Sequence, residues 1–138
     1  MSSTISMQDM MYINLFSKIT GVITKYCFPY NNMILYAVPS DLISKAVGKE
    51  GINVKRLSNT LRKRIKVIAL AQEGQEKKFI ESIVEPITFK DVQVKENEII
   101  LTAGNQMSKA SLMGRNKQRM QEMQRIIESC FGKSFTIV

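Results

Sequence analysis

The strongest constraint on the fold of this chain is an order of elements that occurs twice. Each copy has a β-type segment, a short helical segment, a glycine-containing loop, a longer helical segment and a final β-type segment. The first loop is Gly48–Gly51 and the second is Gly114–Lys117, so they begin 66 positions apart. An internal duplication of a small α/β unit is the simplest explanation. The chain has 138 residues, enough for two small domains of about 70 residues each, with the expected break at 71–75.

The apolar periodicity predicts where the individual elements lie. Helices are expected over 6–20, 42–47, 52–64, 76–84, 106–113 and 118–130, strands over 22–28, 33–38, 65–70, 87–95, 98–102 and 134–138, and turns at 29–32 and 96–97. Ser40 or Asp41 is placed to cap the second helix. In the first helix, Met7 and Met11 belong to a methionine and aromatic stripe at four-residue spacing. We expect this stripe to face the core rather than a partner.

The charge of the chain is concentrated in two segments, within a formal net charge of +8. Residues 45–66 carry eight basic side chains and one acid, a net of +7, and residues 109–125 carry five and one, a net of +4. The segment 67–108 between them holds four lysines and seven acids, a net of −3. Each basic segment contains one of the two glycine loops. This placement indicates a polyanionic partner.

Catalytic and metal sites find little support in this composition. The chain has no histidine, its acids are scattered, and no serine or cysteine has a basic partner at a recognisable spacing. We therefore expect no enzyme, no catalytic residue, no metal, no cofactor and no small-molecule substrate. Cys27 and Cys130 lie in apolar surroundings and are expected to be small buried hydrophobes in a reducing cytosol.

The sequence also gives no sign of a membrane or secretory destination. No apolar run approaches the roughly 20 residues that a membrane span needs. The N-terminus, MSSTISMQDM, lacks the basic-then-apolar order of a secretory signal. We expect a soluble cytoplasmic protein.

The loop Gly48–Gly51 has the chemistry of a site for a phosphodiester backbone. Its outer glycines have no Cβ, so the backbone can turn sharply and approach another chain closely. The amides at the start of the following helix lack an intrahelical partner and carry the positive end of its dipole. The alternative is a plain turn between two helices with one glycine as a cap. A nucleotide-binding P-loop does not fit, because GxxxxGK[ST] is absent and a helix leads into the loop.

These segments resemble a known RNA-binding motif. AVGKEGINVKRL, residues 46–57, is similar to the helix–GxxG–helix hallmark of a KH domain, and LMGRNKQRM, residues 112–120, resembles a second, weaker copy. The surrounding elements look like the type II arrangement. Two tandem KH domains in a chain of this length resemble the archaeal NusA family of transcription factors. The resemblance implies an α/β (α+β) fold of two type II KH domains, 1–74 and 75–138, each a three-stranded mixed sheet packed against helices.

The resemblance also implies a set of RNA-binding residues. In KH domains a single strand of about four nucleotides crosses the GxxG loop, and its bases lie in a groove beside the loop. Carried over, the loop residues clamp the RNA backbone, Val47, Ile52 and Val54 line the groove, and Lys55 or Arg56 reaches phosphates. The full implied set is Val47, Gly48, Lys49, Glu50, Gly51, Ile52, Val54, Lys55 and Arg56 in the first domain, and Gly114, Arg115, Asn116, Lys117 and Arg119 in the second. The implied partners are single-stranded RNA and, beyond it, RNA polymerase.

Two residues depart from the KH pattern. Glu50 places a carboxylate in the first loop, where it repels phosphate unless it points away. Lys117 replaces the last glycine of the second loop, and a residue with a Cβ resists the open backbone angles that glycine adopts there. We therefore expect the second loop to hold RNA differently, by the charge of Arg115, Lys117 and Arg119.

Two other functions remain open at the level of sequence. A KH protein of this kind also fits ribosome assembly or translation. The departures at Glu50 and Lys117 leave room for a third function, an adaptor that docks on RNA polymerase or another protein and uses RNA weakly.

Overall fold

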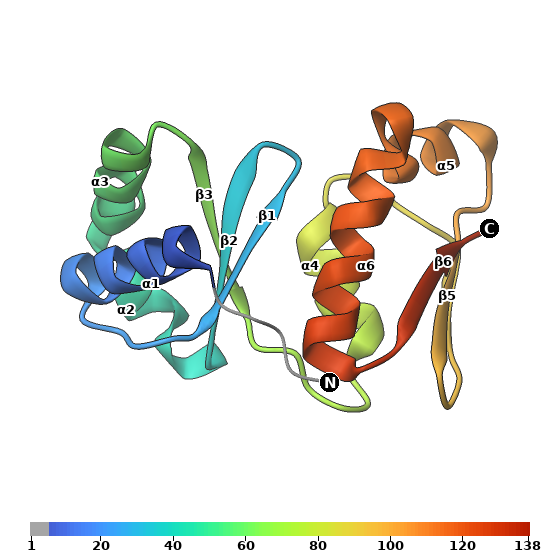
Figure 1. Cartoon of the computed structure of the whole chain (residues 1–138), viewed down its shortest axis with the longest axis horizontal. Helices are drawn as coiled ribbons and strands as arrows, with labels where there is room; N and C mark the ends of the chain where they lie inside the picture. Colours follow the sequence, from blue (N-terminus) through green and yellow to red (C-terminus); the bar gives the residue numbers. More distant parts are fainter. Residues whose placement is uncertain (1–5) are drawn as a thin grey trace. The chain divides into compact units, whose positions relative to one another are not determined.

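The computed structural model describes residues 6–138 and divides the chain into two compact units, whose described parts are 6–70 and 71–138 (Figure 1). The first unit contains α1 (Met7–Thr20), β1 (Tyr26–Tyr30), β2 (Met33–Val38), the 3₁₀ turn η1 (Ser40–Leu42), α2 (Ile43–Val47), the 3₁₀ turn η2 (Lys49–Gly51), α3 (Ile52–Leu61) and β3 (Arg64–Ala69). The second contains α4 (Glu76–Val84), β4 (Asp91–Val94), β5 (Glu98–Thr102), α5 (Gln106–Met113), the 3₁₀ turn η3 (Arg115–Lys117), α6 (Gln118–Phe131) and β6 (Ser134–Ile137). None of the described helices is long and apolar enough to cross a membrane.

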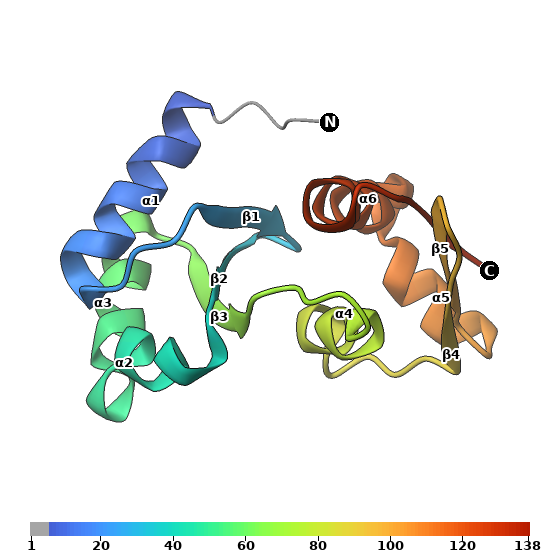
Figure 2. The ribbon, with the colours of Figure 1, turned by 90° about the horizontal axis from the view of Figure 1, so that it is seen from below.

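The two units share one sheet topology. The first sheet has the strand order β1-β2-β3 and the second has the order β4-β5-β6. In each sheet the first two strands are antiparallel and the last two are parallel. In the first unit α1, α2 and α3 cover one face of the sheet (Figure 2). The predicted fold class is therefore confirmed: this is an α+β chain with two three-stranded mixed sheets, each packed against helices.

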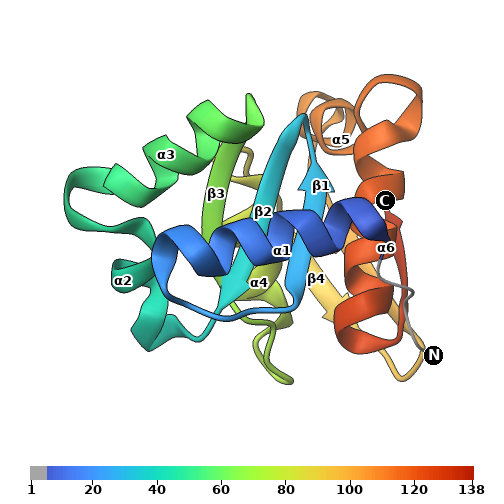
Figure 3. The ribbon, with the colours of Figure 1, turned by 60° about the vertical axis from the view of Figure 1, so that its left-hand side comes forward.

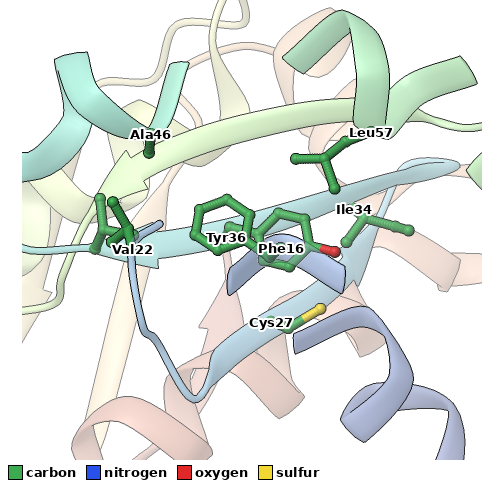
Figure 4. Close-up of a cluster of buried hydrophobic side chains, with 8 residues drawn as sticks. Phe16, Val22, Cys27, Ile34, Tyr36, Ala46 and Leu57 are labelled. Carbon is green, nitrogen blue, oxygen red and sulfur yellow. The ribbon is translucent and has the colours of Figure 1, made fainter. Parts of the chain in front are cut away.

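The core of the first unit lies between its sheet and its helices (Figure 4). Phe16 of α1 stacks on Tyr36 of β2 with ring centroids 4.2 Å apart. The Tyr36 hydroxyl donates a hydrogen bond to the backbone carbonyl of Tyr12 at 2.9 Å, which satisfies its polar group inside the core. Ala46 of α2 and Leu57 of α3 are also fully buried and join both helices to the same cluster. This packing fixes the helices on either side of the first glycine loop.

The second unit has its own buried core, formed by residues of its sheet and of α6. Ile99 and Leu101 of β5 are fully buried, as are Ile126 and Ile127 of α6. Phe135 of β6 is 2% exposed. The apolar face of α6 therefore packs against the sheet, as its sequence period predicts.

The first strand begins later in the sequence than predicted. The expected strand covered 22–28, whereas β1 begins at Tyr26. The Thr24 hydroxyl donates a hydrogen bond to the carbonyl of Ala37 at 2.5 Å and accepts one from the N–H of Tyr26 at 3.2 Å. Side-chain hydrogen bonds thus replace ladder bonds ahead of the strand, and β-branched composition alone does not reveal this.

The turn after β1 is correspondingly shorter than predicted. Pro29 and Tyr30 belong to the strand rather than to the turn, and an edge strand tolerates a proline. The turn itself is Asn31-Asn32, where φ is 51° and 59°. Two consecutive residues of positive φ are typical of a tight two-residue hairpin, and asparagine tolerates that conformation well.

The strand predicted over 87–95 is reduced to Asp91–Val94 in β4. The N–H of Ile87 donates to the carbonyl of Val84 at 3.0 Å, so this residue still belongs to the turn that follows α4. The N–H of Lys90 donates to the carbonyl of Thr102 at 2.8 Å and begins the pairing. At this boundary the apolar residues shift from odd positions, Ile87 and Phe89, to even positions, Val92 and Val94.

The methionine stripe of α1 is only partly a core stripe. Met7 and Met11 are 86% and 56% exposed, and Met10 beside them is 51% exposed. The residues of α1 that pack into the core begin at Tyr12. The prediction of a core face is therefore wrong for the first half of the helix and right for the second.

Two predicted helix boundaries also differ. Neither Ser40 nor Asp41 caps α2 through its side chain; both lie in the turn η1, which begins where the N–H of Leu42 donates to the carbonyl of Pro39 at 2.8 Å. The helix expected to reach residue 64 ends at Leu61, because Arg62 has a φ of 56°. This early end lets β3 begin at Arg64, opposite Met33 of β2.

Candidate nucleic-acid interface

The loop between α2 and α3 projects away from the first sheet (Figure 3). Gly48 has φ and ψ of 81° and 167°, Glu50 has 56° and 27°, and Gly51 has 72° and 21°. The N–H of Gly51 donates to the carbonyl of Gly48 at 3.0 Å and closes the turn. Lys49 and Glu50 are both exposed at its tip. The loop is thus a compact turn in which three of its four residues have positive φ and Lys49 is the exception.

The two glycines of this loop are needed for different reasons. A Cβ on Gly48 would lie 2.9 Å from Nδ2 of Asn53 and 3.0 Å from Cγ2 of Ile52, so a side chain does not fit there. A Cβ on Gly51 would meet no other atom within 4 Å, so only its positive φ favours glycine. The space in front of Gly51 is therefore open to an approaching chain.

The second loop adopts the same backbone conformation as the first. Gly114 has φ and ψ of 74° and 174°, Asn116 has 55° and 30°, and Lys117 has 60° and 23°. The N–H of Lys117 donates to the carbonyl of Gly114 at 3.1 Å, as Gly51 does in the first loop. Lys117 therefore adopts these angles despite its Cβ, and the loss of the glycine does not change the backbone of the loop. The loops differ only in their side chains, which sum to no net charge in Lys49-Glu50-Gly51 and to +2 in Arg115-Asn116-Lys117.

A side-chain brace holds each loop at its base. In the first unit the Asn53 amide donates to the carbonyl of Lys45 at 3.2 Å, which ties the start of α3 to α2. In the second unit the Arg119 guanidinium donates to the carbonyl of Ser111 at 3.0 Å. Both pairs are eight residues apart, and each partner of the second pair stands 66 positions after its counterpart. The brace is therefore a shared feature of the two units.

Arg119 was predicted to contact RNA, and the structure gives it a further role. Its stem packs so closely on Gly114 that a Cβ there would lie 2.7 Å from Cγ of Arg119. The side chain is half-buried and its guanidinium is engaged by Ser111. Arg119 thus positions the second loop, and its contact with RNA stays a prediction.

A groove lies beside the first loop, between α3 and β3. It has a volume of about 510 Å³ and is open to solvent. Its lining comes from Val54, Lys55, Ser58 and Asn59 of α3 and from Arg64 and Ile65 of β3. Val54 and Ile65 are half-buried and form its apolar part, whereas Lys55 and Arg64 are exposed cations. The apolar part suits the face of a flat aromatic ring, and the two cations suit phosphate groups on either side of that ring.

The structure brings only some of the predicted residues to this groove. Val54 and Lys55 line it, whereas Val47 and Ile52 lie at the loop instead, and Arg56 is not part of the lining. Of the whole predicted set, Lys49, Glu50, Ile52, Lys55, Arg56, Arg115, Asn116 and Lys117 are exposed, and Val47, Gly48, Gly51, Val54, Gly114 and Arg119 are half-buried.

The sequence interpretation missed Ser58, Asn59, Arg64 and Ile65. Ser58 and Asn59 could have been found from the sequence, because the i, i+4 spacing places Ser58 on the same face of the helix as Val54, and Asn59 on the same face as Lys55. The two residues of β3 join them only through the pairing of the strand.

The cations around the first loop are available to a ligand. Four cations lie at the loop and groove, and none of them forms an ion pair with another residue of the described range 6–138: Lys49, Lys55, Arg56 and Arg64. An ion pair that the structure does show, Lys77–Asp91 at 3.7 Å, lies in the second unit. The positive charge beside the groove is therefore not neutralised within the described chain.

Cys27 is buried in the core, as predicted, whereas Cys130 is only half-buried, and both are poor nucleophiles. Burial, with a smaller contribution from Asp9, raises the pKa of the Cys27 thiol to about 12, although a hydrogen bond with Tyr36 opposes the rise. Burial likewise raises the pKa of the Cys130 thiol to about 12. The thiolate is the reactive form, so neither side chain is suited to nucleophilic chemistry near neutral pH.

Comparison with known proteins gives two curated relatives. No protein-family model matches the chain. A protein of Methanococcus vannielii named probable transcription termination protein NusA is 33% identical over 96 residues, which cover 68% of this chain and 54% of that protein. A protein of the same name from Methanocaldococcus jannaschii is 31% identical over 88 residues, which cover 64% of this chain and 47% of that protein. The chain is NusA-like. The matched part spans about half the length of these NusA relatives.

A solved structure extends the likeness to the fold. The crystal structure of a protein named APE1850 has a TM-score of 0.69 and covers 96% of the NusA-like chain, while 99% of that protein is matched. The two sequences are 19% identical. At this identity the likeness shows the fold alone.

Proposed function

We propose that the chain binds single-stranded RNA through two KH domains, 1–74 and 75–138, and acts as a transcription elongation or termination factor resembling archaeal NusA. Support for the process comes from the two relatives, which are named probable transcription termination proteins. Support for RNA binding comes from the chain's own loops, groove and charge. RNA polymerase is the further partner that this proposal implies.

The observation that carries the proposal is the shared geometry of the two loops. Both have three positive-φ positions in the same order, both are closed by the same backbone hydrogen bond, and both are braced at the base. Holding Glu50 and Lys117 at positive φ costs about 1–2 kcal/mol for each residue, whereas Asn116 tolerates this conformation better. Positive φ also occurs at ordinary turns of this chain, such as Asn31-Asn32, but strained positions cluster at functional sites, and the same order of them in both loops supports a shared contact surface.

In the first domain each part of the surface then has a role. The RNA backbone crosses the loop, where the absence of a side chain on Gly51 leaves room for close approach. A base enters the groove and packs on Val54 and Ile65. Lys55 and Arg64, at the rim, are placed for the flanking phosphates. Because much of the affinity is electrostatic, binding should weaken steeply as salt is raised.

The test is a second carboxylate in the first loop. Gly51→Asp adds a negative charge in the open space that the RNA backbone would occupy. A like charge about 4 Å away costs about 1 kcal/mol in water, so the affinity for RNA should fall about fivefold or more. The measurement is fluorescence anisotropy with a labelled single-stranded RNA, with duplex RNA of the same sequence for comparison.

Gly132→Asp is a matched control for this variant. Gly132 has φ and ψ of 66° and 27°, close to those of Gly51, and its Cβ would also meet nothing within 4 Å. It follows the C-terminal end of α6, whereas the second loop precedes the N-terminal end of that helix. The control should retain the affinity of the unchanged protein. An equal loss in both variants, or no loss in Gly51→Asp, would contradict the role of the loop.

Two experiments separate this function from its alternatives. Sequencing of RNA crosslinked to the protein in cells should return nascent transcripts, whereas ribosomal RNA would favour the role in ribosome assembly or translation. Partners that stay bound after nuclease treatment would favour the adaptor that docks on RNA polymerase.

A further inference from the structure

The last strand of each sheet has an open edge. β3 and β6 each pair with one strand of their own sheet, so half of their backbone groups face away from it. In β6 the N–H groups of Ser134 and Val138 donate to carbonyls on the side of β5. Because neighbouring residues of a strand alternate between its two edges, the carbonyl of Phe135 faces the open edge. In β3 the N–H of Leu70 donates to β2, and the same alternation places the carbonyl of Ile65 at the open edge.

The two units place different side chains beside this edge. Ile65 pairs with Ile34 in the first sheet, and Phe135 pairs with Ile99 at the equivalent position of the second. Ser58 of α3 lines the same groove as Ile65. The residue 66 positions after Ser58 is Gln124 of α6.

Gln124 reaches across from the helix to the strand. Its amide nitrogen donates a hydrogen bond to the carbonyl of Phe135 at 3.2 Å. The side chain therefore spans the position where the first unit has its open groove, and it occupies an acceptor that a base could otherwise use. A serine at this position is too short to make the same contact, and the first unit accordingly keeps its groove open between Ser58 and Ile65.

We propose that Gln124 closes the base groove of the second unit and confines base recognition to the first. This inference rests on the proposed binding of RNA. The loop of the second unit, with Arg115 and Lys117, then contacts phosphates, and the bases above it are not read. RNA is held by two units but recognised by one.

The experiment locates the bases on which binding depends. The probe is a labelled single-stranded RNA of about ten nucleotides, selected from a random pool on the full chain, since a KH domain covers about four. In a set of derivatives, a block of consecutive nucleotides is made abasic, which removes bases and keeps phosphates, and the block is moved along the probe. With the unchanged protein, one block should weaken binding about fivefold or more, because each stacked base contributes strongly. The other blocks should have little effect.

Two reciprocal substitutions test the side chain itself. Gln124→Ser should open the second groove, so that a second sensitive block appears. Ser58→Gln should close the first groove, so that the original block loses its effect. Gln106→Ser, at an exposed position of α5 in the same unit, is the control and should leave the pattern unchanged. None of the three positions is buried, so each variant should fold. Thermal melting checks that it does.

The outcomes decide between this inference and the proposed function. Two sensitive blocks with the unchanged protein, or one block with Gln124→Ser, would overturn the closed groove while RNA binding stands. If no RNA from the pool is bound at all, the proposed function fails and this inference fails with it.

Discussion

The Gly48→Ala substitution tests whether the first loop is fixed by the contacts described above. Gly48 has a φ of 81° and a ψ of 167°, a region of backbone space that is almost restricted to glycine and costs other residues about 1–3 kcal/mol. The new Cβ would also lie 2.9 Å from the Asn53 amide. The amide must then move, which weakens its hydrogen bond to Lys45, and such a bond contributes about 1 kcal/mol. The expected loss of unfolding free energy is about 2–4 kcal/mol.

Gly51→Ala in the same loop is the internal comparison. Gly51 has φ and ψ of 72° and 21°, and its Cβ would meet nothing within 4 Å. Only the left-handed conformation then counts against alanine, at about 1 kcal/mol. Two substitutions of identical chemistry, three residues apart, should therefore differ by about 1–3 kcal/mol.

Urea unfolding followed by tyrosine fluorescence is the suitable assay. All four tyrosines, Tyr12, Tyr26, Tyr30 and Tyr36, lie in the first unit, and the chain has no tryptophan. The signal therefore reports on the unit that carries the mutation. An equal or smaller loss for Gly48→Ala than for Gly51→Ala would refute the assignment of the clash to Asn53.

Three further predictions concern other parts of the chain. Lys117→Gly should relieve the positive φ and stabilise the second unit by about 0.5–1 kcal/mol in a circular-dichroism melt, while the removed charge lowers the salt slope of RNA binding by about 1. The thiols of Cys27 and Cys130 have pKa values raised from 9.0 to about 12, so the unfolded state binds fewer protons between these pH values and stability falls as pH rises. Urea titrations at intervals from pH 8 to 11 should show this fall, at most about 1.4 kcal/mol per pH unit for each thiol, and a flatter profile for Cys27→Ala. Hydrogen peroxide should oxidise Met7, which is 86% exposed, well before Met123, which is 2% exposed, as read by peptide mass spectrometry.

The helices and loops were predictable because their signals are local. α4 and α5 have the predicted bounds, since their apolar spacing and flanking residues lie within one short segment. α1 ends at residue 20 as predicted, and α6 ends one residue later than predicted; each is followed by a glycine in the left-handed conformation, Gly21 and Gly132. The repeat of the loops 66 positions apart was visible for the same reason.

The groove was less predictable because it depends on strand pairing. Arg64 and Ile65 reach it only because the parallel register sets Arg64 opposite Met33, and no local pattern states that register. The late start of β1 has a similar origin, since the Thr24 hydroxyl bonds to a residue 13 positions away. At Lys117 a local signal was present but did not decide the structure. The preference of a lysine against positive φ is overridden by the braced helices on both sides of the loop.

The braces at Asn53 and Arg119 have a consequence for the thermodynamics of recognition. Each loop is braced in the free chain, so in the proposed complex the protein should lose little conformational entropy on binding. The flexible partner in that complex would be the RNA strand, and most of the entropy lost on association would belong to it. Affinity should accordingly respond more to a pre-stacked, stiff RNA segment than to further stiffening of the protein.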